Sequence, residues 1–400
     1  MNDDTRIDGK NTAARITTAA IVSSLVYAFV MTLPSTLINE IIDAFSLKGA
    51  GEGLMISLIN IGFLATLIVI PLFQGRIHKI TMIIAACLLM AATLVMIGAA
   101  SGLVVFAVSC VILGVSESFL DTSSNSVIVD VRKAESAKYL GYLHGFFGVG
   151  SLIAPLLIYR LLSYLDWRGI HYVIAVVSVA TAVFIFFLVR NRSGSAAAPV
   201  IIEQKLRKSD LAEYFRRRRN ILLSLAGILA SMAQSGVIMW IVRYMTLRFD
   251  AAELGALSMS VFWLCVTANR LLLAQVIKRA PMRFFALGAL LFGVCLTIGV
   301  VSGNAIVLCI AMGATGFCGG LFIPVLVSEF AVGYEGRTSF TTSVVMFVTG
   351  IPRVAAPVLV ALASTKISLF FGMMIPVASA ILAAVCGLAL YRNEKAKAMG

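Results

Sequence analysis

Charged residues are scarce in this sequence. Asp, Glu, Lys and Arg make up 13% of the 400 residues, whereas a soluble globular protein has about a quarter. Apolar residues make up 60% of the chain, which is about what twelve membrane-spanning helices of about 20 residues each would use. The composition therefore argues against an ordinary soluble domain and predicts a polytopic membrane protein.

Several motifs of catalysis and energy coupling are missing from the sequence. It has no GxxxxGK[ST] motif, so nucleotide-driven pumping has no support. It has no HExxH or related metal spacing, no channel-filter signature and no CxxC pair. We therefore predict no enzyme activity, no cofactor and no metal site. The cysteines all fall inside apolar segments, as small packing residues do: Cys87, Cys110, Cys265, Cys295, Cys309, Cys318 and Cys386.

The positive charge of the chain lies in short loops between apolar runs. The net charge of +13 could suggest a nucleic-acid partner, but cations that follow the second, fourth, sixth and eighth predicted helices are typical of cytoplasmic loops. The loops near residues 101 and 303 carry no charge. We therefore expect a lipid bilayer as the partner, no nucleic acid, an even number of helices and both termini in the cytoplasm. The apolar run from Ile16 lacks a signal-peptide cleavage site and is expected to be a retained first helix.

Twelve apolar segments are long enough to span a membrane, and one long polar segment divides them. We expect an N-terminal six-helix bundle over residues 1–190, a basic cytoplasmic linker over 191–219 and a C-terminal six-helix bundle over 220–400. The predicted spans are 16–39, 53–74, 80–100, 103–128, 137–162, 169–190, 220–244, 254–276, 284–302, 304–328, 338–363 and 367–391.

The two halves resemble each other at corresponding positions. In the predicted fifth helix, Pro155 follows Gly148 by seven residues, and in the eleventh helix Pro357 follows Gly350 by the same interval. Such matches are weak singly, but together they indicate the parallel repeats of a two-fold repeated transporter.

Two carboxylates lie in the middle of the fourth predicted helix. Glu117 and Asp121 are four residues apart and therefore share one face, which Asn125 continues. A charge inside the membrane is costly and marks a functional site by default. Two close carboxylates in a low dielectric do not both ionise easily, which suits proton coupling. The alternative is a structural hydrogen bond to a neighbouring helix.

His144 lies in the fifth predicted helix, among glycines that allow close helix approach. Histidine can donate, accept or take up a proton, so His144 is expected either at the site or as a packing residue. Arg353, in the eleventh helix, mirrors Ser151 by the repeat. Because arginine stays charged, it is expected to bind an anionic or oxygen-rich substrate, to fill a structural role, or to pair with one of the carboxylates Glu117, Asp121 and Glu329.

Two further arginines in the predicted spans are expected to be less central. Arg270, in the eighth helix, can extend towards the cytoplasmic side and is assigned a gating or structural role. Arg243 lies beside Trp240 and Tyr244, and is expected to be an anchor at the membrane interface. Helix ten contains several glycines and Pro324, a composition that suits either bending or tight packing.

The stretch from Phe119 to Asn125 and the stretch from Leu143 to Gly150, with Pro155, resemble the fucose–proton symporter branch of the major facilitator superfamily. The specific motif covers about 40 residues, and the twelve-helix plan with a basic central linker covers the whole chain. The resemblance implies that Asp121, Asn125 and His144 face a central cavity, with the acid serving proton coupling or substrate binding.

The sequence also departs from that branch. Ser35 stands where the fucose symporter has a second acid, and Gln234, six residues before Trp240, replaces an acid of several relatives. Arg76 and Lys79 occupy the loop signature after the second helix without its aspartate, and are assigned gating or structural roles.

The predicted function is that of a secondary transporter for a small-molecule substrate. We expect proton-coupled symport of a sugar or sugar derivative, which can be anionic, with sodium as an alternative coupling ion. Asp121 and Glu117 would carry the proton, while Asn125, His144, Gln234 and Arg353 would bind substrate. The alternatives are a proton-driven efflux carrier for amphipathic compounds and a non-transporting membrane sensor or intramembrane enzyme. A monomer in the bacterial inner membrane is expected.

Overall fold

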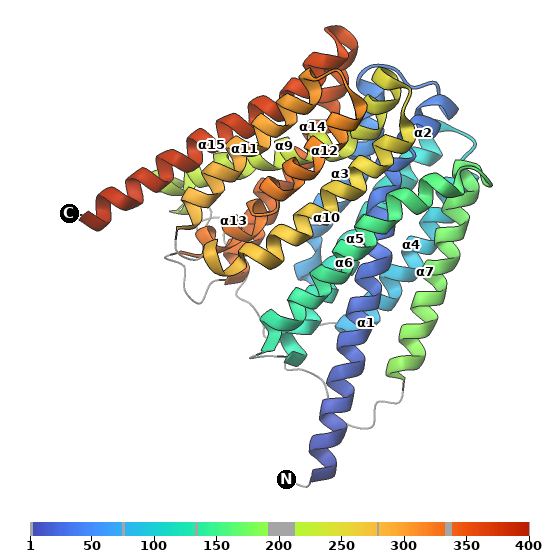
Figure 1. The fold of residues 1–400 in the computed structure, drawn as a ribbon. Coiled ribbons are helices and arrows are strands. Elements are labelled where there is room, and N and C mark those ends of the chain that lie inside the picture. Colours follow the sequence, from blue (N-terminus) through green and yellow to red (C-terminus); the bar gives the residue numbers. More distant parts are fainter. Residues whose placement is uncertain are drawn as a thin grey trace. The chain divides into compact units, whose positions relative to one another are not determined.

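The computed structural model, drawn in Figure 1, describes residues 3–73, 77–132, 135–190, 213–277, 280–332 and 338–399. Every regular element in these ranges is a helix, and twelve helical stretches are long and apolar enough to cross a membrane. The predicted all-α fold with twelve membrane-spanning helices is confirmed. The placement of both termini in the cytoplasm stays a prediction.

The chain divides into two compact units. The first comprises Met1–Ile41 and Leu58–Ile202, and the second comprises Ile42–Ser57 and Glu203–Gly400. Residues 191–212 of the predicted linker lie outside the described residues, so the predicted domain boundaries stay predictions. The helices before the linker are α1 (Asp3–Thr36), α2 (Ile38–Ala44), α3 (Ala50–Phe73), α4 (Lys79–Ala99), α5 (Leu103–Arg132), α6 (Ser136–Leu161) and α7 (Trp167–Val189). Those after it are α9 (Arg218–Phe249), α10 (Ala252–Ile277), α11 (Pro281–Val301), α12 (Ala305–Gly319), α13 (Phe322–Ala331), α14 (Thr338–Lys366) and α15 (Leu369–Met399).

Polar side chains close the ends of several helices. The Asn304 side chain precedes α12 and accepts hydrogen bonds from the backbone N–H groups of Ile306 and Val307. Arg168 donates to the carbonyls of Gly98 and Ala100, at distances of 2.8 and 2.6 Å, where α4 ends. Backbone groups at helix ends lack partners within the helix, so these side chains fix where the spans stop.

Within each unit, glycine permits two helices to cross at backbone distance. A Cβ at Gly114 of α5 would overlap the carbonyl of Ile59 in α3. A Cβ at Gly316 of α12 would likewise overlap the carbonyl of Phe262 in α10. The hydrophobic driving force between helices is weak in lipid. Small residues at such crossings allow the close van der Waals packing that holds the helices together instead. The second and fourth spans of each half therefore pack in the same way.

The tenth predicted span is broken. The structure ends α12 at Gly319 and begins α13 at Phe322, so the segment that we predicted as one span over 304–328 consists of two helices. Arg270 of α10 donates from Nε to the carbonyl of Gly320 at 3.3 Å, within this break. A helix break leaves carbonyls without their usual partners, and Arg270 supplies one.

Candidate functional site

The two predicted acids lie on one face of α5 and differ in exposure. Glu117 is buried, with 4% of its surface exposed, while Asp121 is half-buried one turn later. Asn125 follows after another turn and donates from Nδ2 to Asp121 Oδ1 at 2.9 Å. The predicted polar face is therefore present, and its last two members are hydrogen-bonded to each other.

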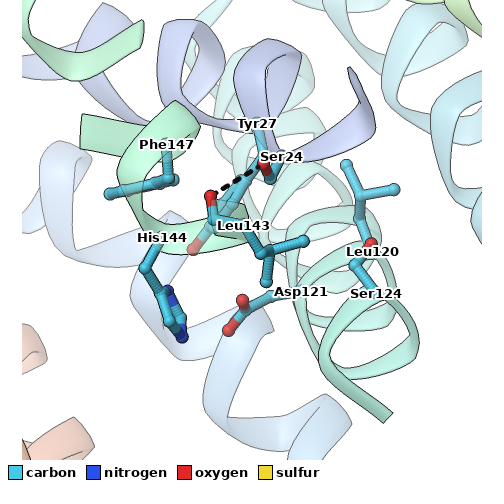
Figure 2. A pocket seen from close by; sticks show the side chains of 8 residues that line it. All are labelled: Ser24, Tyr27, Leu120, Asp121, Ser124, Leu143, His144 and Phe147. Carbon is cyan, nitrogen blue, oxygen red and sulfur yellow. Dashed lines mark hydrogen bonds between the residues drawn. The ribbon is translucent and has the colours of Figure 1, made fainter. Parts of the chain in front are cut away.

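Asp121 and His144 line the same recess in the first unit (Figure 2). The figure shows both side chains pointing into one space, Asp121 from α5 and His144 from α6. A carboxylate accepts hydrogen bonds, and imidazole donates or accepts according to its tautomer. The recess can therefore hold a hydroxyl group or a proton. Its lining residues are Ser24, Tyr27, Leu120, Asp121, Ser124, Leu143, His144 and Phe147.

Serine hydroxyls join the three helices that form the recess. Ser24 of α1 donates to the carbonyl of Leu143 in α6 at 3.2 Å, the dashed line in Figure 2. The hydroxyls of Ser23 in α1 and Ser124 in α5 lie 3.0 Å apart and share a hydrogen bond. Both serines of α1 are buried, so these bonds fix α1 against its two neighbours.

Close packing between α1 and α6 completes the walls. A Cβ at Gly150 would lie 2.7 Å from the Cβ of Ala28, which leaves room only for glycine. The rings of Tyr27 and Phe147 lie with centroids 5.4 Å apart, a separation typical of favourable aromatic pairs. The glycines that we singled out in the sequence around His144 thus serve, at Gly150, the close approach of α1.

The second unit contains the other two predicted substrate-binding residues. Arg353 lies on α14 and Gln234 on α9, and both side chains are half-buried. Glu329, one of the carboxylates considered as a partner of Arg353, is instead paired with Arg219, which also donates to the Glu329 carbonyl at 3.2 Å. The sequence could not reveal that pairing, because Arg219 lies 110 residues away in the chain.

The residues assigned to gating or structure have different surroundings. Lys79, at the start of α4, forms a 2.6 Å ion pair with Asp130 near the end of α5. The sequence analysis did not identify this partner of Lys79. Arg270 bonds the helix break described above. Arg76 lies outside the described residues.

The prediction that Arg243 anchors the chain at the membrane interface is wrong. Its side chain is 13% exposed, and its Nε lies 3.6 Å from Glu52 Oε2, whose side chain is 9% exposed. Both residues belong to the second unit. Burial makes a pairing partner necessary for an arginine, and no local sequence signal connects residues this far apart.

Comparisons with known proteins identify a family that this chain matches over more than half of its length. A family model described as Major Facilitator Superfamily matches residues 19–286. Among curated protein sequences, no match was found.

Several solved structures share the fold. A bacterial homolog of the human lysosomal transporter Spinster, inward-facing and unoccupied, matches with a TM-score of 0.78 and 14% identity over 95% of this chain and 97% of that one. The E. coli fucose:proton symporter matches with a TM-score of 0.64 and 16% identity over 94% and 98%. A D-xylose-proton symporter matches with a TM-score of 0.73 and 12% identity over 93% and 96%. At these identities the likeness shows the fold alone.

Proposed function

Because this chain belongs to the Major Facilitator Superfamily of transporters, we propose that it carries a small polar solute across the membrane by proton-coupled symport. The solute would be a sugar or sugar derivative, which can be anionic. Transport would proceed by alternating access, in which a site opens to one side of the membrane at a time. The coupling ion, the solute class and the bacterial inner membrane as location all belong to this proposal.

One observation carries the proposal: a carboxylate and an imidazole line one recess within apolar helices. Asp121 and His144 come from different helices and reach the same space. Ionisable groups inside the membrane are costly, and they characteristically mark ion or substrate pathways. In this proposal Asp121 takes up and releases the proton, with Glu117 one turn away as a second acid, and His144 bonds the solute.

The second unit contains two further residues that we propose as substrate-binding. Gln234 can donate and accept hydrogen bonds, while Arg353 offers a permanent cation for a carboxylate or an oxygen-rich group. The named fucose and D-xylose symporters share the fold of this chain, which is compatible with a sugar but does not select one. The polar set on α5 and α6 and the motif resemblance support the sugar class.

The experiment is uptake into proteoliposomes under an imposed pH gradient. Radiolabelled neutral sugars, sugar acids and other small organic anions would be compared for the wild type and Asp121→Asn. The proposal expects proton-driven accumulation of at least one compound, which Asp121→Asn abolishes. A matched control is Asp250→Asn, the same change of acid to amide at an exposed helix C-cap outside the recess, which should leave accumulation intact.

Two other outcomes would overturn the proposal in defined ways. Accumulation that follows a sodium gradient and ignores pH would move the coupling role to sodium. Proton-dependent extrusion of amphipathic compounds, without accumulation of any polar solute, would favour the efflux carrier.

A further inference from the structure

Asn125 directs its amide at Asp121. Its Nδ2 donates to Asp121 Oδ1 at 2.9 Å and to the Asp121 backbone carbonyl at 2.9 Å. Side chains on a helix lean towards its N-terminus, so a residue naturally covers the position four residues before it. The contact is therefore a consequence of the four-residue spacing, and it needs no other helix.

This geometry leaves Asn125 little to offer a solute. An asparagine amide nitrogen has two N–H donors, and the two hydrogen bonds that it makes both go to Asp121. Only its carbonyl oxygen remains available as a hydrogen-bonding group. Asn125 is also outside the set of residues that line the recess, whereas Asp121 is inside it.

We propose that Asn125 is a positioning residue, which holds the Asp121 carboxylate in the recess, and not a substrate-binding residue as the sequence suggested. The bond to the backbone carbonyl fixes the amide, and the fixed amide in turn restricts rotation of the carboxylate. The inference rests on the proposed function of Asp121 as the proton carrier. It assigns to Asn125 an effect on coupling without an effect on the affinity for the solute.

The first test is spectroscopic and requires no known substrate. Infrared difference spectra of the purified full chain between high and low pH would be recorded, and the C=O band of protonated Asp121 would be identified by its loss in Asp121→Asn. A hydrogen bond to a carbonyl lowers its stretching frequency. In Asn125→Leu, which keeps the branched shape and the number of side-chain heavy atoms but has no donor, the band should shift to higher frequency. Ser126→Ala is the matched control, because Ser126 bonds the backbone of its own helix, at Ser123, and the band should stay in place.

The outcomes separate the inference from the proposed function. If no Asp121 band changes between the two pH values, the proposed proton carrier is wrong. If the band titrates but does not move in Asn125→Leu, the positioning role is wrong while the proton carrier stands.

The second test uses flux of whichever compound the wild type accumulates. Exchange of labelled for unlabelled solute at equal pH reports solute binding, while accumulation under a pH gradient also needs proton coupling. Loss of a hydrogen bond to the solute, worth about 1.4 kcal/mol, would raise the half-saturation concentration for exchange about tenfold. We expect Asn125→Leu to change that concentration less than about twofold, while accumulation falls strongly. A tenfold rise would restore Asn125 to the substrate-binding set.

Discussion

Helix α5 of the first unit and the pair α12–α13 of the second are counterparts in the repeat, yet they use their polar positions differently. Both cross a neighbouring helix through a glycine, Gly114 in α5 and Gly316 in α12. Three residues later α5 carries Glu117 and continues unbroken, whereas α12 reaches Gly319 and ends. The same packing contact thus supports titratable side chains in one half and a break in the backbone in the other.

Acids within the helices also differ in their surroundings. Asp121 of the first unit is bonded to Asn125 and lines a recess. In the second unit Glu52 and Glu329 are each held by an arginine. An ion pair favours the charged form of an acid, and Asp130 of the first unit is paired in this way with Lys79. Asp121 differs from these three acids because it faces a recess, and for that reason we proposed it as the proton carrier.

The largest expected effect on stability concerns the buried ion pair of Arg243 and Glu52. Arg243→Met leaves Glu52 buried without its partner and should lower the free energy of unfolding by about 3–5 kcal/mol. The double variant Arg243→Met with Glu52→Gln should recover most of that loss. Thermal unfolding in detergent measures both.

The control for this prediction is an exposed ion pair in the same unit. Arg217 and Glu213 lie 3.9 Å apart with side chains 55% and 66% exposed, so Arg217→Met should cost less than about 0.5 kcal/mol. Equal losses for the buried and exposed pairs would contradict the distinction.

Leucine at the glycine of either helix crossing should lower the free energy of unfolding by a similar amount. A leucine at Gly114 or at Gly316 meets a backbone carbonyl that cannot move aside, and each should cost about 3 kcal/mol through overpacking. Gly145→Leu is the matched control, since a Cβ at Gly145 meets nothing within 4 Å. Loss of stability is again measured by thermal unfolding. Tolerance of leucine at only one of the two crossings would show that the halves do not share this contact.

The break between α12 and α13 gives a smaller effect. Arg270→Met removes a charged donor from the Gly320 carbonyl and should cost about 2 kcal/mol. Amide hydrogen exchange should become faster around residues 319–322, while exchange in α5 stays unchanged. Arg248→Met, at the end of α9 where Arg248 lies over the ring of Phe249, controls for the loss of a cation. Faster exchange throughout the chain would contradict a local role.

The smallest expected effect on stability concerns the ion pair of Lys79 with Asp130, near the end of α5. Lys79 and Asp130 are 32% and 20% exposed, so Lys79→Met should cost less than about 1 kcal/mol, and the loss should diminish in high salt. Unfolding at two salt concentrations is the measurement. A salt-independent loss would indicate that the pair is less accessible to solvent than its exposure suggests.

Much of the fold follows from local sequence patterns. Span length, apolar content and the i, i+4 spacing of Glu117 and Asp121 are properties of single segments. Twelve spans and the shared face of the two acids are present, and the tenth span differs by its break into α12 and α13. The repeat of glycine and proline pointed to α6, one of the three helices that build the recess, and to α14 of the other unit. Such patterns depend only on residues that are close together in the sequence, so they can be recognised without a structure.

The rest depends on which helices become neighbours. Glu52 and Arg243 lie in different spans, and only tertiary packing brings them together. The partner of Asn125 lay within reach on the same helix, but donor direction had to be seen before a positioning role could be separated from substrate binding. The helix break was foreshadowed by Gly319, Gly320 and Pro324, although the same composition is ordinary in packed membrane helices.

The serine bonds around the recess have a consequence for how its walls can move. Buried hydroxyls join α1 to α5 and to α6, so a displacement of α1 alone would break both bonds. If the protein works by alternating access as proposed, we expect these three helices to move together, with Asp121 and His144 carried along in an unchanged arrangement.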